Sequence, residues 1–324
     1  MHKHRFLNTP YKKIITISCV ILLILCAIYL LAGINGNNWD FFLPRRGIKV
    51  ITIIIVSFCI GYSSLVFQTI TNNKILTPSV MGLDSLYLFI QTVIVYFLGS
   101  KQLSMMNGYG NFFISLAAMI LCSWILFLLL FKRENKSIYF LVLTGMIIGN
   151  FFQGLSTFMQ VLLDPNEFSV LQGTMFASFN NINTSLLGIS ILITCIVIWI
   201  SYKDLSSLDV LSLGKDTSIN LGVPYDKLVL KKLMIISVLV SVSTVLVGPI
   251  TFLGILIVSL TRNVISTYKH SYLGIQVTLL GSIFLIAGLL IVERIFHFET
   301  TMSVIINFIG GTYFLYIMLK ERKQ

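Results

Sequence analysis

The stretch from Ile14 to Ala32, IITISCVILLILCAIYLLA, holds nineteen consecutive residues without a charge. A helix needs about twenty apolar residues to cross the hydrocarbon layer of a bilayer, which is roughly 30 Å thick. Backbone N–H and C=O groups in lipid must bond within the protein, so such a run is expected to be helical. The basic residues before it are also typical of a signal peptide. However, the apolar core is too long and no small-residue cleavage site follows, so we expect this span to be retained.

Similar apolar runs recur along the whole chain and predict ten membrane-spanning helices. Their approximate bounds are 14–34, 47–70, 80–98, 112–131, 138–160, 184–202, 233–248, 250–267, 272–293 and 302–320. Only Gly248-Pro249 separates the seventh span from the eighth, so this boundary depends on a single pair of residues. The sequence therefore predicts an all-α, polytopic membrane protein with residues 1–324 in a single transmembrane domain.

The composition excludes most soluble classes of protein. The chain has 324 residues, of which 56% are hydrophobic and 11% are charged, and its mean hydropathy is +0.92. A soluble domain carries about 25% charged residues. This chain cannot cover a water-facing surface, so a soluble enzyme, a nucleic-acid binder and a disordered protein are all poor interpretations.

The net charge of +11 is explained by membrane topology. If the N-terminus lies in the cytoplasm, 18 of the 23 Lys and Arg residues fall on the cytoplasmic side and five fall outside. Cytoplasmic loops of membrane proteins carry an excess of Lys and Arg. We therefore expect both termini in the cytoplasm, a cell-membrane location and contact with lipid, but no nucleic-acid partner.

The sequence contains no recognisable catalytic or metal-binding arrangement. The nearest match to a phosphate-binding loop, Leu213-Gly214-Lys215-Asp216, lacks the first glycine and the hydroxyl that would meet magnesium. The five cysteines lie in apolar runs and the four histidines have no metal-ligand spacing. We expect no enzymatic activity and no cofactor bound by this chain. Nearly all carboxylates lie at the edges of the predicted spans, and Asp84 is the only one placed to lie inside a span. An ion-driven secondary transporter would need it or another buried charge as its coupling site.

Three segments carry a specific pattern. The first runs from Leu43-Pro44-Arg45-Arg46 to Gly82, the second comprises 210–214 and 221–224, and the third runs from Gly248 to Arg262. Together they resemble the FecCD-type permeases of bacterial ABC importers for iron-siderophores, haem and cobalamin. The family's Pro-His pair is replaced by Val258 and Ser259, which is similar to the branch that handles catecholate siderophores such as petrobactin. The family-motif residues are Gly61, Gln68, Pro78, Gly82, Gly248, Pro249, Phe252, Gly254 and Arg262.

The resemblance implies a cobalamin-importer-like permease fold and a transport subunit that performs no covalent chemistry. Two permease chains, in this branch more often a heterodimer than a homodimer, would enclose a path for a ferric-siderophore. A separate dimer of ATP-binding subunits would drive transport, and an extracytoplasmic substrate-binding lipoprotein would deliver the substrate. Import of haem or cobalamin by the same family remains an alternative, as does the ion-coupled transporter.

The resemblance also assigns roles to individual residues. It implies docking of the binding protein at Arg45, Arg46, Arg294 and Glu299. Residues 203–232 would form a cytoplasmic coupling loop that contacts the ATPase through Leu213, Gly214, Leu221, Gly222, Val223 and Pro224, with a glycine turn at Gly222. Ile138 and Tyr139 align with the cytoplasmic gate. The arginines could instead extend to lipid phosphates, Glu299 could be a solvated rim charge, and Ile138 and Tyr139 could be core residues.

Overall fold

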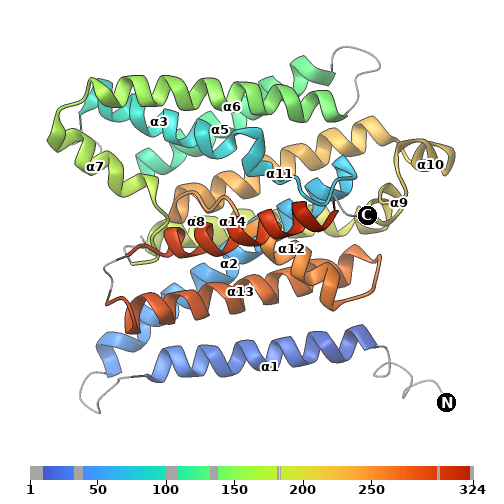
Figure 1. The fold of residues 1–324 in the computed structure, drawn as a ribbon, viewed down its shortest axis with the longest axis horizontal. Coiled ribbons are helices and arrows are strands. Elements are labelled where there is room, and N and C mark those ends of the chain that lie inside the picture. The colour runs from blue at the N-terminus through green and yellow to red at the C-terminus, as the bar shows by residue number, and fades with distance from the viewer. Residues whose placement is uncertain are drawn as a thin grey trace.

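The computed structural model describes residues 10–32, 39–99, 108–131, 138–180, 182, 184–297 and 300–321. In these residues every regular element is a helix (Figure 1). The helices are α1 (Pro10–Leu31), α2 (Trp39–Thr71), the short 3-10 helix η2 (Pro78–Met81), α3 (Leu83–Leu98), α5 (Gly108–Phe131), α6 (Ile138–Val161), α7 (Pro165–Met175), α8 (Thr184–Tyr202), α9 (Leu205–Leu211), α10 (Lys215–Asn220), α11 (Tyr225–Val247), α12 (Leu253–Val264), α13 (His270–Arg294) and α14 (Met302–Glu321).

Each of the ten predicted spans coincides with a helix, and the all-α fold class is confirmed. The matching helices are α1, α2, α3, α5, α6, α8, α11, α12, α13 and α14. The largest differences between predicted and observed bounds lie at the starts of two helices. Helix α2 begins at Trp39 rather than 47, and α11 begins at Tyr225 rather than 233. Both extensions contain charged residues, which apolar runs alone do not include.

Five helices in the described part of the chain are long and apolar enough to cross a membrane by themselves: Tyr11–Leu31, Trp39–Thr71, Val142–Val161, Tyr225–Val247 and His270–Arg294. A sixth span is possible if α8 and α9, which meet at a bend of 64°, are counted as one. Shorter apolar helices occupy the remaining predicted positions.

The eighth predicted span, 250–267, is shorter in the structure than predicted, with α12 running from Leu253 to Val264. Helix α12 has 12 residues, which at 1.5 Å per residue extend about 18 Å and cannot cross a layer of roughly 30 Å. Gly248 has φ +99° and Pro249 has no N–H to donate, so α11 stops and five residues run without helix before α12 begins. Gly248, Pro249 and Ile250 are buried, and irregular backbone at membrane depth is tolerated where protein encloses it.

Figure 1 shows that the start of α1, the end of α14 and the short helices α9 and α10 lie at one end of the bundle, while α7 lies at the other. This arrangement agrees with the prediction that both termini and the coupling segment share one side of the membrane. We call the end with α9 and α10 the inner end, and the end with α7 the outer end.

Helix α2 is the central element of the packing. Nearly all of its residues from Val50 to Thr71 are buried, and it packs against α11, α12 and α13. Its buried side chains contribute to two hydrophobic clusters, one shared with α3, α5, α8 and α11 and the other with α1, α12 and α13. A displacement of α2 therefore has to move both halves of the bundle.

A close backbone contact joins η2 to α6. Gly82 has φ +85°, and a Cβ atom placed on Gly149 would lie 2.6 Å from the Cα atom of Gly82. Real Cβ atoms essentially never approach another atom that closely, so neither position has room for a side chain. Small residues at this crossing allow two segments of a membrane protein to approach closely.

Candidate functional site

The inner end carries two short helices that protrude from the bundle. Helices α9 and α10 are joined at Gly214, which has φ +98°, and α10 is followed by Gly222, which has φ +81°. These left-handed conformations confirm the predicted glycine turn at Gly222, and they reverse the chain within a few residues. The turn brings α10 back against α9 and leads into α11.

An apolar surface faces outward on these helices. Leu213 and Leu221 are each 60% exposed, and Ile219 is 48% exposed. Val223 is half-buried and Pro224 is exposed. Exposed apolar residues gathered on a protrusion are typical of a docking surface for another protein. Leu208 and Leu211, on the other face of α9, are buried against the bundle.

Polar contacts attach α9 to the bundle at its start and in its middle. Before α9, Asp204 lies 2.7 Å from Lys231 Nζ and 3.2 Å from Lys232 Nζ on α11. In the middle of α9, Asp209 Oδ1 lies 2.7 Å from both Nδ1 and the backbone nitrogen of His270, the first residue of α13. The segment that holds α9 is therefore tied to two different helices of the bundle, α11 and α13.

These contacts set the charge state of the two aspartates. Burial by itself raises the pKa of Asp209, but hydrogen bonds from the side chain and backbone of His270 outweigh it and hold the pKa below its usual value. Burial likewise raises the pKa of Asp204, and Lys231 and Lys232 outweigh that effect so that its pKa is also lowered. Both carboxylates are thus ionised at neutral pH.

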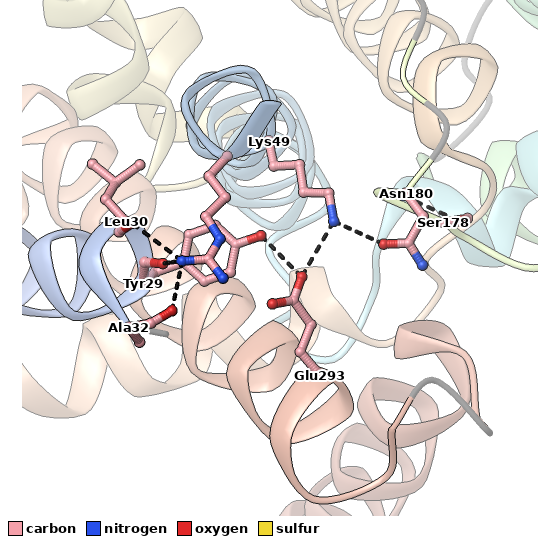
Figure 2. A network of polar contacts seen from close by, with 8 residues as sticks. Tyr29, Leu30, Ala32, Lys49, Ser178, Asn180 and Glu293 are labelled. Carbon is pink, nitrogen blue, oxygen red and sulfur yellow. Dashed lines mark hydrogen bonds and ion pairs between the residues drawn. The ribbon is translucent and has the colours of Figure 1, made fainter. Parts of the chain in front are cut away.

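The outer end contains a polar network that joins α1, α2 and α13 (Figure 2). Lys49 Nζ on α2 donates to Asn180 Oδ1 at 3.0 Å and to Glu293 Oε1 at 3.2 Å. The hydroxyl of Tyr29 on α1 donates to the same Glu293 oxygen at 3.0 Å. The side chains of Lys49 and Glu293 are only 17% and 11% exposed, so this network holds the outer ends of three helices together with little access to water.

Arg46 lies beside this network and contacts the end of α1. Its Nη1 atom is within 3.1 Å of the carbonyl oxygens of Tyr29, Leu30 and Ala32. Arg294 on α13 also donates to the carbonyl of Ala32, at 2.6 Å. The last carbonyls of a helix have no partner within the helix and carry partial negative charge, so two guanidinium groups are favourable there. From the sequence, a binding protein and lipid phosphate were considered as partners of these arginines, but the carbonyl groups at the end of α1 were missed.

The predicted docking residues therefore differ in their surroundings. Arg45 is exposed, with its guanidinium 3.9 Å from the ring centre of Phe41 one turn away. Arg294 is exposed although it contacts Ala32, whereas Arg46 is half-buried. Glu299 lies outside the described residues. Docking by these four residues stays a prediction.

The predicted gate and family-motif residues have different outcomes. Ile138 and Tyr139 begin α6, but their side chains lie outside the described part of the chain, so the gate stays a prediction. The family-motif residues lie mainly at helix crossings and breaks. At the crossings, Gly61 faces Val277, Gly254 faces Ser64 and Phe252 packs beside Gly310. Pro78 begins η2, Gly248 and Pro249 follow the last residue of α11, Gln68 is buried in α2, and Arg262 lies in the last turn of α12.

Sequence reasoning missed His270 and the charged residues that hold α9. His270 was noted only as a histidine without a metal-ligand spacing, and the lysines and aspartates of the inner end were counted only for topology. Only their positions in the sequence could have pointed to this contact. His270 begins an apolar run, and Asp209 lies within the segment that resembles a coupling loop. Among the described residues, no group of three or more His, Cys, Asp or Glu is placed to bind a metal ion.

Comparison with known proteins identifies one transport family, two permease relatives and a solved structure of similar fold. The model of the FecCD transport family matches residues 13–320. The chain is 51% identical over 291 residues to the petrobactin import system permease protein YclO of Bacillus subtilis, covering 89% of this chain and 91% of that protein. It is 29% identical over 287 residues to the petrobactin import system permease protein YclN of the same organism, covering 85% and 84% respectively. A solved chain of an inward-facing transporter, described as of the metal-chelate ABC type, has a TM-score of 0.81 at 22% identity and covers 96% of this chain and 99% of its own.

Proposed function

This chain belongs to the FecCD transport family, and from that premise we propose that it imports a petrobactin-type ferric catecholate as one half of a paired permease. It is a multi-pass protein of the cytoplasmic membrane and a permease subunit of a siderophore ABC importer. The chain performs transport and no chemical conversion of its own. What we propose beyond family membership is the identity of the chelate, the partner chains and the residues that contact those partners.

The observation that carries the proposal is a polar face on α6. Asn150, Gln153 and Thr157 lie in the middle and second half of this helix and are exposed in the single chain. Gly154 lies between them and is exposed as well. Polar side chains at membrane depth are costly when they face lipid. A second permease chain and a polar path between the two chains would cover this face.

The names of the relatives support a heterodimer that carries a petrobactin-type chelate. YclO and YclN are both named as petrobactin import permeases of one organism, and this chain is much more similar to YclO than to YclN. Because one organism has two different permeases of this name, we expect a complex of two different permease chains in which this chain is the YclO-like one. Haem and cobalamin, which the family resemblance left open, have no support from these names.

The inner end is proposed to receive the ATP-binding subunits. Residues 203–232 would act as the coupling loop, with docking contributed by Leu213, Gly214, Leu221, Gly222, Val223 and Pro224. The exposure of the two leucines supports this role, since burial of each in an interface would be favourable. Ile138 and Tyr139 are proposed to form the gate at the same end.

The outer end is proposed to receive the substrate-binding lipoprotein. Arg45 and Arg294 are exposed cations on this side, where carboxylates of a docking protein could pair with them. Glu299 would offer the opposite charge, and Arg46 would contribute mainly by holding α1 in place.

The proposal is tested by reconstituting the complex in proteoliposomes. We expect uptake of ferric petrobactin that requires ATP, both permeases, the ATP-binding subunits and the binding protein, with little uptake of haem or cobalamin. Preferred uptake of haem or cobalamin would contradict the proposed substrate. Accumulation against a gradient by this chain alone would contradict the dependence on an ATPase and favour the ion-driven alternative.

A further inference from the structure

A buried histidine connects the coupling segment to the centre of the bundle. His270 is 2% exposed and lies where α9, α13 and α2 meet. Its Nδ1 atom is 2.7 Å from Asp209 Oδ1 on α9, and its Nε2 atom is 2.8 Å from Thr69 Oγ1 near the end of α2. Through one imidazole ring, the protruding helix α9 is joined to the helix that occupies the middle of both hydrophobic clusters.

The chemistry of the three partners determines how the contacts are made. A carboxylate can only accept hydrogen bonds, so the proton shared with Asp209 lies on Nδ1 of His270. The hydroxyl of Thr69 can accept a hydrogen bond from Nε2 or donate one to it, and it also lies 3.0 Å from the carbonyl of Leu65. The backbone N–H of His270 donates to the same Asp209 oxygen, which fixes the position of α13 as well as the ring.

We propose that His270 is a positioning residue that transmits movement of the coupling helices to α2 and α13. The inference rests on the proposed function, because it assumes that an ATPase moves α9. Apolar contacts of α9, such as those of Leu208 and Leu211, are non-directional and allow sliding. Hydrogen bonds fix direction and distance. The one between His270 and Thr69 is buried and is not exchanged readily for water, and Asp209 is held by two hydrogen bonds, from the ring and from the backbone of His270. A displacement of Asp209 therefore displaces the ring and, with it, Thr69.

The chain offers a closely matched pair of residues for the test. Thr69 and Thr71 lie on α2, are both buried, and both bond through the hydroxyl to the carbonyl four residues earlier. Only Thr69 also contacts His270. Thr69→Val and Thr71→Val therefore remove the same groups from the same helix, and they differ in the contact with the imidazole ring.

The measurement is the amount of ferric chelate transported per ATP hydrolysed by the reconstituted complex. We expect Thr69→Val to lower this ratio about fivefold to tenfold, the factor that corresponds to the net contribution of one buried hydrogen bond. Thr71→Val should keep the wild-type ratio, and Thr69→Ser, which retains the hydroxyl, should restore it. His270→Leu should lower the ratio at least as much as Thr69→Val.

A merely structural role would reduce the yield or thermal stability of the complex without changing the ratio. The inference is overturned if Thr69→Val keeps the wild-type ratio, or if Thr69→Val and Thr71→Val lower it equally. Failure of the wild-type complex to transport any chelate with ATP would refute the proposed function and remove the premise of the inference with it. Transport by the wild type with an unchanged ratio in Thr69→Val would refute the inference alone.

Discussion

Arg46 Nη1 lies 2.7 Å from the carbonyl oxygen of Ala32, so an arginine at the outer end of α2 caps the C-terminal end of α1. Arg294 reaches the same carbonyl from α13. Helix α1 is otherwise lightly packed, with many exposed apolar side chains along its length. The two arginines and the hydrogen bond of Tyr29 to Glu293 therefore fix the outer end of a helix that has few buried contacts.

The two neighbouring arginines of α2 should respond differently to removal of charge. Arg46→Gln is expected to lower the thermal unfolding temperature of the purified complex, because hydrogen bonds between a charged group and carbonyls contribute about 1.5–3 kcal/mol. Arg45→Gln should leave the unfolding temperature unchanged and weaken association with the binding protein. Thermal unfolding and binding to the immobilised binding protein are the two measurements. If the two variants had equal effects on the unfolding temperature and on binding to the binding protein, the different roles proposed for Arg45 and Arg46 would be contradicted.

The pair of Lys49 and Glu293 should show energetic coupling in a double-mutant cycle. Lys49→Met or Glu293→Gln alone is expected to destabilise the protein by about 1–3 kcal/mol, since each removes one charge of a largely buried, hydrogen-bonded ion pair. The double variant should cost clearly less than the sum of the two. Free energies of unfolding in a denaturant titration would measure this. Additive effects would indicate that the ion pair contributes nothing specific.

The crossing of η2 and α6 should not tolerate a methyl group. Gly149→Ala would place Cβ 2.6 Å from Gly82 Cα and 3.2 Å from Gly82 N, and these backbone atoms cannot move aside as the end of a flexible side chain could. We expect a loss of about 1–3 kcal/mol, as for other overpacked sites. Gly154→Ala on the same helix is the control, because its Cβ would meet nothing within 4 Å. The recovery of monodisperse protein after heating would distinguish the two variants.

The exposed leucines of the inner end should determine association with the ATP-binding subunits. Replacing both Leu213 and Leu221 by Ser is expected to weaken this association by at least about tenfold, because burial of each leucine contributes about 1.5–3 kcal/mol. The permease should still fold, since both side chains are 60% exposed. Thr217→Ala, an exposed position on α10, serves as the control. Undiminished co-purification of the ATP-binding subunits with the double variant would argue against docking at this surface.

Much of the architecture could be predicted from consecutive residues. Apolar runs such as 14–32 indicate a membrane-spanning helix without reference to any other part of the chain, because the requirement to satisfy backbone groups in lipid is local. The distribution of Lys and Arg predicted which ends of the helices lie together, and the glycine at 222 predicted a turn. The eighth span was predicted too long, because hydropathy does not distinguish a buried irregular segment from a helix. Gly248 and Pro249 marked the break, but its length was set by packing around it.

The candidate sites depended on contacts that no local pattern contains. Tyr29 and Glu293 are separated by 264 positions, and His270 meets partners that are 61 and 201 positions away. By itself, the sequence determined that the chain is a bundle of membrane-spanning helices, and it predicted which of its ends face the cytoplasm. Only the tertiary structure decided that Arg46 caps α1 and that His270 joins α9 to α2. The physical reason is that hydropathy acts on each segment separately, whereas a hydrogen bond exists only once packing has brought its two partners within about 3 Å of each other.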